Sequence, residues 1–149
     1  MKEGSKPKRV RESSFGWLVN ALARRADARM REELAELGLD LSSFATLMTL
    51  FEREGIAQAE LSAAVGVQSY ATTRTLDKME REGLVERRAN PKSRRAHQVF
   101  LTEKGRAFRG NLIAIVARVN EEALQDLSAS NRKQLVKWLQ EIELASRDE

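Results

Sequence analysis

The chain has 149 residues, of which 42% are hydrophobic and 32% charged, and this balance predicts one soluble, helix-rich domain over residues 13–149. No apolar run approaches the roughly 18–20 residues that a membrane span requires, and the N-terminus lacks the apolar stretch of a secretory signal. Cysteine is absent and His97 is the single histidine, which excludes a disulfide framework and a thiolate zinc site. We therefore expect a cytoplasmic protein with no cofactor, no metal and no contact with a membrane.

The net charge of +4 is unevenly distributed along the chain. Residues 74–109 contain eleven lysines and arginines against five acidic residues, so this stretch carries +6 and the remainder carries −2. A local cationic excess beside a nearly neutral remainder is typical of a surface that binds a polyanion. Charge alone leaves open the alternative, which is a solvated charged face on a helical protein.

The first third of the chain predicts a tail and two helices. Residues 1–12 are basic and show no apolar periodicity, which predicts a flexible tail. Apolar side chains at helical spacing predict a first helix over 14–37. A second helix is predicted over 44–51, capped by Ser42 or Ser43.

The central segment predicts a helix pair followed by a hairpin. A short helix over 58–65 is followed by a turn at Gly66 and by another helix over 69–82. Leu84–Arg88 and His97–Leu101 predict two strands, and the connection between them is rich in turn-forming residues. This order is the layout of a helix-turn-helix with a wing, and it predicts a mainly α (α+β) fold.

Two long amphipathic helices complete the prediction. Thr102 opens the first of them and Ser128 caps the second. Because the unit over 41–101 is too small to cover them, we expect residues 13–40 and 102–149 to form the interface of a homodimer. Packing within a single chain is the alternative for the same apolar stripes. The predicted interface residues are Leu18, Leu22, Leu112, Ile115, Val119, Leu135, Trp138 and Leu139.

The second helix of the pair carries a face suited to the major groove of double-stranded DNA. At 100° per residue, Thr72, Leu76 and Met79 fall on the side that packs on the preceding helix, and polar and basic side chains fall opposite. The N-terminal residues of such a helix normally meet base edges, and Arg74 is best placed for a bidentate contact to guanine. The alternative for Arg74 is an ion pair with Asp77 one turn away. The predicted contacts are Ser69, Tyr70, Thr73, Arg74, Lys78 and Arg81.

The hairpin is the second basic element. Five of residues 86–95 are lysine or arginine. Beside a recognition helix, a two-stranded finger of this kind can reach the neighbouring minor groove, where narrow A·T-rich sequences attract arginine. The predicted wing contacts are Arg87, Arg88, Lys92, Arg94 and Arg95.

With these elements in place, residues 58–105 resemble the signature of the MarR family, and the resemblance extends over about residues 14–145. It implies a winged-helix homodimer with interlocked terminal helices, which represses or activates transcription at a pseudo-palindromic operator. Thr73 and Arg74 fall where the family's recognition helix carries its Thr-Arg pair, and Arg95 falls on the wing-tip arginine.

One position departs from the family's pattern. The family usually has an aspartate two residues before the wing arginine, and this chain has Ser93, which cannot form the ion pair that orients the guanidinium. We expect a looser wing and a larger share of non-specific binding. The start of the following helix keeps the pattern, with Leu101, Thr102 and Gly105.

The resemblance also implies a small effector, because members of the family bind anionic aromatic compounds between the dimer helices and the winged domain. The residues suited to such a site, for which dimer core is the alternative, are Phe15, Trp17, Arg24, Phe44 and Met48. The chain contains no enzyme motif. A second possible function is a winged-helix interaction or architectural module without operator specificity, and discrimination between bases separates the two.

Overall fold

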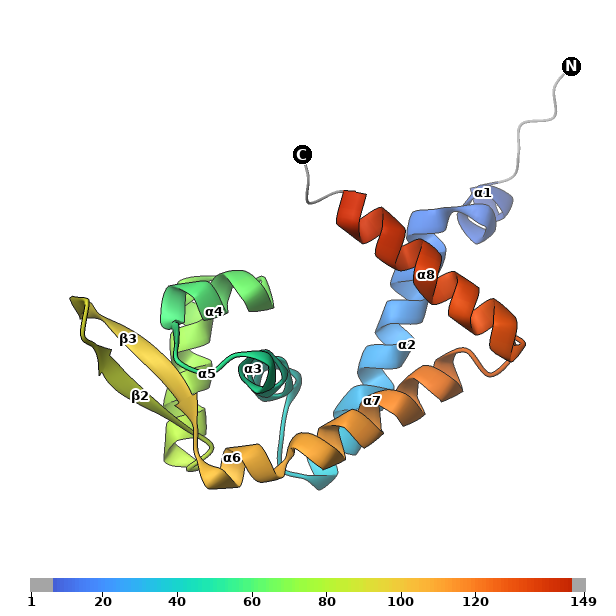
Figure 1. The fold of residues 1–149 in the computed structure, drawn as a ribbon. Helices are drawn as coiled ribbons and strands as arrows, with labels where there is room; N and C mark the ends of the chain where they lie inside the picture. The colour runs from blue at the N-terminus through green and yellow to red at the C-terminus, as the bar shows by residue number, and fades with distance from the viewer. Residues whose placement is uncertain (1–6, 146–149) are drawn as a thin grey trace, which may run out of the picture. The chain divides into compact units, whose positions relative to one another are not determined.

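The structure is a computed structural model, and it describes residues 7–145 except for the side chains of Arg94 and Arg95. It is mainly helical with one small antiparallel sheet, which confirms the predicted fold class (Figure 1). In the described range, no single helix is long and apolar enough to cross a membrane, and α2 with α3 passes that test only as a bent pair. The elements are α1 (Pro7–Ser13), α2 (Phe15–Glu36), α3 (Leu41–Glu52), β1 (Ile56–Ala57), α4 (Gln58–Val65), α5 (Ser69–Arg81), β2 (Val85–Asn90), β3 (Ser93–Leu101), α6 (Glu103–Ala107), α7 (Arg109–Ala123) and α8 (Ala129–Ala145).

The chain divides into two compact units. The central unit comprises residues 27–117, and the terminal unit comprises the described residues up to 26 together with those from 118 onward. Both boundaries fall inside helices, so α2 and α7 each contribute to both units.

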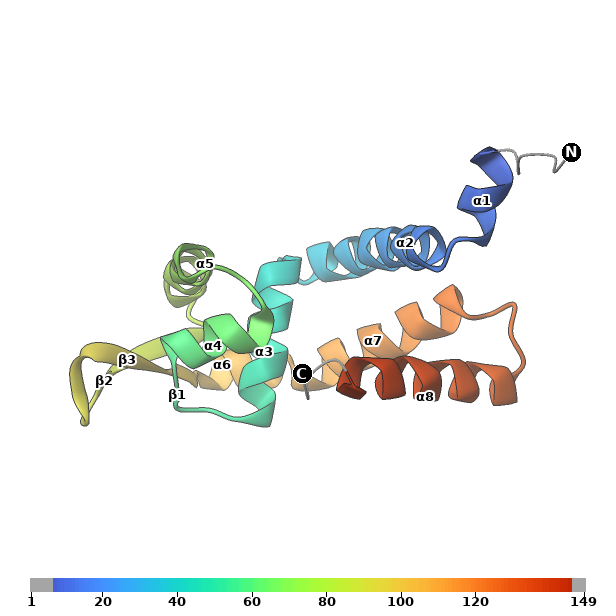
Figure 2. The same ribbon diagram turned by 90° about the horizontal axis from the view of Figure 1, so that it is seen from above.

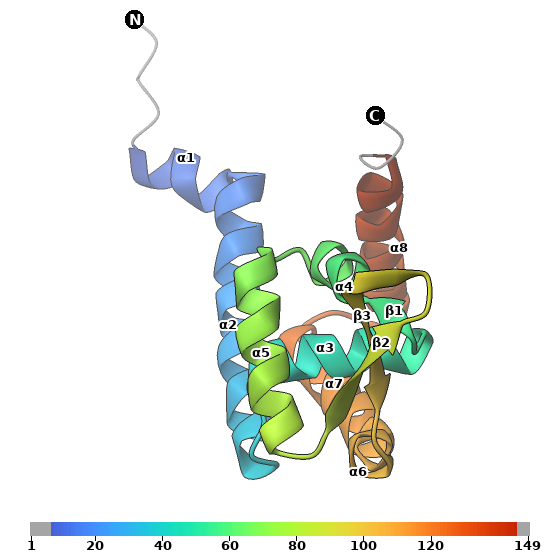
Figure 3. The same ribbon diagram turned by 90° about the vertical axis from the view of Figure 1, so that its left-hand side faces the viewer.

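The central unit has a core of aliphatic side chains contributed by α3, α4, α5 and β3. Leu47, Leu61, Leu76, Met79 and Val99 are all fully buried. The sheet has the order β1-β3-β2 with antiparallel pairing throughout. In Figure 3, α5 and the β2–β3 hairpin both lie on the near side of this unit, with α3 behind them. Helix α5, which is predicted to contact bases, and the basic wing therefore lie on the same side of the unit.

The turn between α4 and α5 is formed as the sequence predicts. Gly66 has φ +75°, a left-handed conformation that costs glycine little, and its backbone N–H donates to the Ser62 carbonyl at 3.0 Å. Inside the pair, the Ser62 hydroxyl donates to the Thr72 hydroxyl at 2.8 Å in a buried position. This bond satisfies both hydroxyls and fixes the rotation of α5 about its own axis against α4.

Two local features of the central unit differ from the prediction. Helix α3 is capped by Asp40 and not by Ser42 or Ser43, because Asp40 Oδ1 accepts a hydrogen bond from the Ser43 backbone N–H at 2.8 Å. The hairpin is also longer than predicted, with a tight turn at Pro91 and Lys92. Asn90 Oδ1 accepts from the Lys92 backbone N–H at 2.9 Å, which closes the turn locally and lets both strands extend.

The helix predicted to begin at Thr102 is divided. Thr102 caps α6 as expected, since its Oγ1 accepts from the Gly105 backbone N–H at 3.0 Å. Phe108 ends α6, because its own N–H donates to the Gly105 carbonyl in a tightened last turn, and α7 begins one residue later. The single long helix of the prediction is therefore two helices.

The terminal unit contains α1, the first part of α2, the end of α7, and α8 (Figure 2). Ser128 caps α8 as predicted, with its Oγ accepting from the Asn131 backbone N–H at 3.2 Å. The turn before α8 is held by Arg132, which donates to the carbonyls of Leu127 and Gln125. Residues 7–12 are helical where the sequence predicts a flexible tail, and residues 1–6 of that predicted tail lie outside the described range.

The apolar residues predicted to face a second copy fall into two groups. Leu112, Ile115 and Val119 are at most 3% exposed, so they are core residues of the chain itself and cannot meet a partner. For these three the alternative left open by the sequence holds. Leu135 is partly buried. The residues that remain substantially exposed, at 43–55% of their surface, are Leu18, Leu22, Trp138 and Leu139.

Candidate nucleic-acid interface

Helix α5 is anchored by one face and leaves the other open. Thr72, Leu76 and Met79 are buried, as their spacing predicts. On the opposite face Tyr70 is 70% exposed, and Arg74 and Arg81 are also exposed. This amphipathic division gives a rigid helix whose free side chains are polar, aromatic and cationic.

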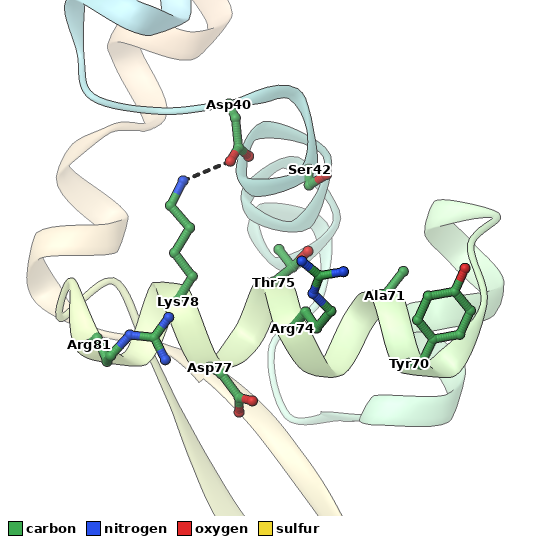
Figure 4. Close-up of a pocket in the computed structure, with 9 residues that line it drawn as sticks. All are labelled: Asp40, Ser42, Tyr70, Ala71, Arg74, Thr75, Asp77, Lys78 and Arg81. Carbon is green, nitrogen blue, oxygen red and sulfur yellow. Dashed lines mark hydrogen bonds and ion pairs between the residues drawn. The ribbon is translucent and has the colours of Figure 1, made fainter.

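A groove of ≈ 530 Å³ follows this open face toward the N-terminus of α3 (Figure 4). Figure 4 shows the Arg74 side chain directed toward α3, whereas Tyr70 projects at the N-terminal end of α5. Neither Arg74 nor Arg81 forms an ion pair or side-chain hydrogen bond with any residue that the structure describes, so the alternative pairing of Arg74 with Asp77 is not found. Both guanidinium groups are available to an external anion.

Lys78 lies in the same groove and has a partner that the sequence did not predict. Its Nζ donates to Asp40 Oδ2 at 2.7 Å and lies 3.9 Å from Glu82. The pKa of Lys78 is raised, chiefly by the hydrogen bond to Asp40. Burial by itself would raise the pKa of Asp40, but hydrogen bonds from Lys78 and Ser43 outweigh it and hold that pKa below its ordinary value.

Arg87, predicted as a wing contact, is bound to α5 instead of being free. Its guanidinium donates to Glu80 Oε2 through Nε at 3.0 Å and through a terminal nitrogen at 2.5 Å, and to Asp77 at 2.5 Å. The Arg87 backbone N–H also donates to Glu80 at 2.9 Å. These hydrogen bonds raise the pKa of Arg87 and lower that of Glu80. The position therefore favours a structural role, which is to hold strand β2 against the recognition helix.

The remaining predicted wing residues differ in their surroundings. The Arg88 guanidinium pairs with Glu86 and lies 4.2 Å from the centre of the Phe100 ring. Lys92 is exposed at the turn, and its ammonium has no partner in the described part of the chain. The side chains of Arg94 and Arg95 lie outside the described residues, so their predicted contacts stay predictions.

Thr73 and Ser69, two predicted DNA contacts at the N-terminal end of α5, differ in their exposure. Thr73 is only half-exposed: its hydroxyl donates to the Ser69 carbonyl and accepts from Gln58 Nε2 at 2.7 Å. Ser69 is exposed and lines a second hollow of ≈ 350 Å³ together with Gln58 and His97. Ser69 is therefore more accessible to a ligand than Thr73.

A sequence model of the MarR family matches residues 39–97, the segment that contains the groove, the helix pair and most of the wing. Solved structures agree over almost the whole chain. A MarR transcriptional regulator from Methanosarcina mazei Go1 is 26% identical with a TM-score of 0.83, and the alignment covers 89% of this chain and 96% of that one. Residues 39–97 therefore form a MarR-family domain. The chain is a DNA-binding transcription regulator with a winged helix-turn-helix.

Two MarR structures from E. coli extend the comparison. Wild-type MarR in its apo form is 27% identical with a TM-score of 0.78, over 87% of this chain and 96% of that one. A mutant MarR complexed with operator DNA is 25% identical with a TM-score of 0.80, over 92% of this chain and 99% of that one. The likeness to MarR therefore includes a structure that holds DNA.

The residues predicted to line a MarR-type effector site are divided between the two units. Phe15, Trp17 and Arg24 belong to the terminal unit, and Phe44 and Met48 belong to the central unit, so neither unit by itself brings the five together. The Trp17 ring instead carries the Arg11 guanidinium 4.7 Å from its centre. The effector site stays a prediction.

The site also contains residues that sequence reasoning did not select. Asp40 lies 38 positions before its partner Lys78, and Gln58 lies 15 positions before Thr73. No helical spacing or motif joins such pairs, because tertiary packing alone brings them together. For Glu80 a signal existed: it lies one turn after Asp77 in a helix facing a basic strand, an arrangement that invites a shared guanidinium.

Proposed function

We propose that the protein is a sequence-specific transcriptional repressor that binds a pseudo-palindromic operator as a homodimer in the cytoplasm. The observation that carries the proposal is the open face of α5, where Tyr70 and Arg74 project from a helix whose other face is locked into the core. A rigid helix with free hydrogen-bonding side chains near its N-terminus is suited to reading base edges in a major groove. The likeness to a mutant MarR complexed with operator DNA supports it.

In this proposal the cations of the interface have different roles. Arg74 reads a guanine through two hydrogen bonds, a contact worth roughly 1–3 kcal/mol of discrimination against the wrong base. Arg81, near the C-terminal end of α5, and Lys92 at the hairpin turn bind phosphates without sequence preference. Arg94 and Arg95 enter the neighbouring minor groove, as the resemblance implies.

The dimer is proposed from the exposed apolar surface of the terminal unit. Trp138, Leu139 and Ile142 on α8 are 43–57% exposed, and Leu18 and Leu22 on α2 are similarly uncovered. Large apolar side chains clustered along one helix are typical of a surface that a partner covers. We propose that a second copy of the chain covers them.

The dimer can be tested by light scattering of the purified protein and of a Leu139→Glu variant. We expect the mass of a dimer for the wild type, and the mass of a monomer for the variant at micromolar concentration. Gln140→Glu adds the same charge one residue away and should remain dimeric. A wild-type mass of 16.8 kDa, that of one chain, would contradict the proposal.

The proposal includes release of the operator by a small aromatic or anionic effector. The support is the exposure of two aromatic side chains of the terminal unit, Phe15 at 64% and Trp17 at 46%. A panel of aromatic carboxylates, added to the operator complex, should contain compounds that release DNA and quench the Trp17 fluorescence. If release occurs without any effect of Trp17→Phe on the effective concentration, the effector acts elsewhere.

Operator specificity is tested by selection from random duplexes at physiological salt, followed by sequencing. We expect a pseudo-palindrome with half-sites about one helical turn apart. Arg74→Ala should relax the preference at defined base pairs, and Arg81→Ala, a matched cation on the same helix, should weaken all sequences alike. Retention of DNA without a shared motif would instead favour the architectural module.

A further inference from the structure

The groove beside α5 contains an ion pair that competes with DNA. Lys78 extends from α5 toward the N-terminus of α3, where it binds Asp40 (Figure 4). Its neighbours in the groove, Arg74 and Arg81, have no such partner in the described part of the chain. Of the cations that line the groove, Lys78 is thus the one whose charge is already neutralised.

The Asp40 carboxylate accepts two hydrogen bonds, one through each oxygen. Oδ1 accepts the hydrogen bond from the Ser43 backbone N–H that caps α3, and Oδ2 accepts the hydrogen bond from Lys78. Asparagine caps helices as well as aspartate does, so the cap alone does not require a carboxylate. The negative charge of Asp40 therefore acts specifically on Lys78.

The ion pair between Lys78 and Asp40 is exposed enough for Lys78 to change its partner. The side chains of Lys78 and Asp40 are 37% and 51% exposed, and an ion pair in such a position contributes little net stability. A phosphate that approaches Lys78 can therefore replace Asp40 as the partner of the ammonium. While the pair is intact, Lys78 releases no DNA counterion, because its charge is already compensated.

We propose that Asp40 is a specificity-determining residue, which withholds Lys78 from DNA until α5 is seated in its groove. In a loose complex with non-specific DNA, Lys78 stays on Asp40 and contributes nothing to binding. When α5 occupies the groove of the operator, a DNA phosphate comes within reach of Lys78. Lys78 then leaves Asp40 and binds the phosphate, which releases a counterion from the DNA. The inference rests on the proposed function, since it assumes that an operator complex differs from a non-specific one.

The test compares wild type with Asp40→Asn, which keeps the cap and removes the charge. Binding of the full chain is measured by fluorescence anisotropy, as a function of salt, on the selected operator and on a mixed-sequence duplex. On mixed-sequence DNA the variant should steepen the slope of log K against log salt by about 0.9 for each protomer, and raise the affinity at 0.15 M salt about fivefold for each protomer. On the operator the slope should be unchanged, because Lys78 is already on phosphate there.

Three further variants decide whether Lys78 is the cause. In a Lys78→Ala background, Asp40→Asn should no longer steepen the slope on mixed-sequence DNA. Glu52→Gln removes the same charge from the other end of α3 and should leave the slope unchanged. Asp40→Ser, a second uncharged cap, should reproduce Asp40→Asn, which protects the result against a folding defect in one variant.

Several outcomes would overturn the inference. An unchanged or shallower slope for Asp40→Asn on mixed-sequence DNA would show that the pair does not withhold Lys78. Equal steepening in the Lys78→Ala background would show a general repulsion by Asp40. Failure of the proposed function is visible in wild type alone, as equal affinity for both duplexes, and it would remove the role in specificity whatever the variants do.

Discussion

Replacing Arg87 with alanine should lower the free energy of unfolding by about 2 kcal/mol. The substitution removes three hydrogen bonds from the guanidinium and leaves Asp77 and Glu80 close together without a counter-ion. Fully exposed ion pairs contribute about 0–1 kcal/mol, and breaking a fully buried pair costs about 3–5 kcal/mol. Since the side chains of Arg87, Asp77 and Glu80 are 21%, 43% and 32% exposed, the cost should fall between these limits.

The measurement is urea unfolding followed by far-ultraviolet circular dichroism, at one fixed protein concentration because the protein is proposed to be a dimer. Arg88→Ala is the matched control. It removes a neighbouring arginine whose side chain is 58% exposed, and should cost less than about 1 kcal/mol. The two variants therefore separate a guanidinium that fastens the wing from one that lies on its surface.

The same pair of variants distinguishes the structural role of Arg87 from the DNA contact that its sequence position predicts. If Arg87 holds the wing, its loss lowers stability and weakens DNA binding without changing the salt dependence. If Arg87 binds phosphate, stability is nearly unchanged and the slope of log K against log salt becomes shallower by about 0.9 for each protomer. The second result would refute the role assigned to the Asp77 and Glu80 contacts.

Three other results are expected. Arg87 holds the pKa of Glu80 below its ordinary 4.5, so ionised Glu80 stabilises the fold above that pH. This stabilisation is lost as the pH falls through the lowered pKa. The urea midpoint should therefore drop on acidification, and it should drop less steeply in Glu80→Gln. Gly105→Ala should destabilise the protein by about 1–3 kcal/mol in the same urea assay, because its Cβ would lie 2.1 Å from the Leu84 carbonyl oxygen. Ser93→Asp should tighten the wing and lower non-specific DNA affinity in anisotropy titrations; an unchanged ratio of operator to non-specific affinity would contradict this.

The elements of the central unit could be predicted from the sequence because their signals are local. The helices over 58–65 and 69–81 follow from apolar spacing, and Gly66 marks the turn between them since it alone tolerates that backbone conformation cheaply. The cap at Ser128 is likewise a bond between neighbours three residues apart. These predictions required only the residue and its next turn, and they were confirmed.

Predictions that depended on tertiary packing fared differently. Helical periodicity shows that Leu112, Ile115 and Val119 share a face, but it cannot tell whether the same chain or a second copy covers that face. In the same way, a run of basic residues shows where cations are, but it does not show which of them form ion pairs with carboxylates. Arg87 and Lys78 both have partners contributed by other elements of the fold.

Fewer cations are therefore free to meet DNA than the eleven lysines and arginines of residues 74–109 suggest. Among the described side chains of α5 and the hairpin, the fold pairs Lys78, Arg87 and Arg88 with carboxylates and leaves Arg74, Arg81 and Lys92 without partners. Non-specific affinity grows with every cation that is free to neutralise a phosphate, whereas discrimination between bases requires only the few that reach base edges. Internal pairing thus lowers non-specific affinity without lowering discrimination between bases. A regulator that must leave non-specific DNA to find its operator gains from carboxylates placed inside its own binding surface.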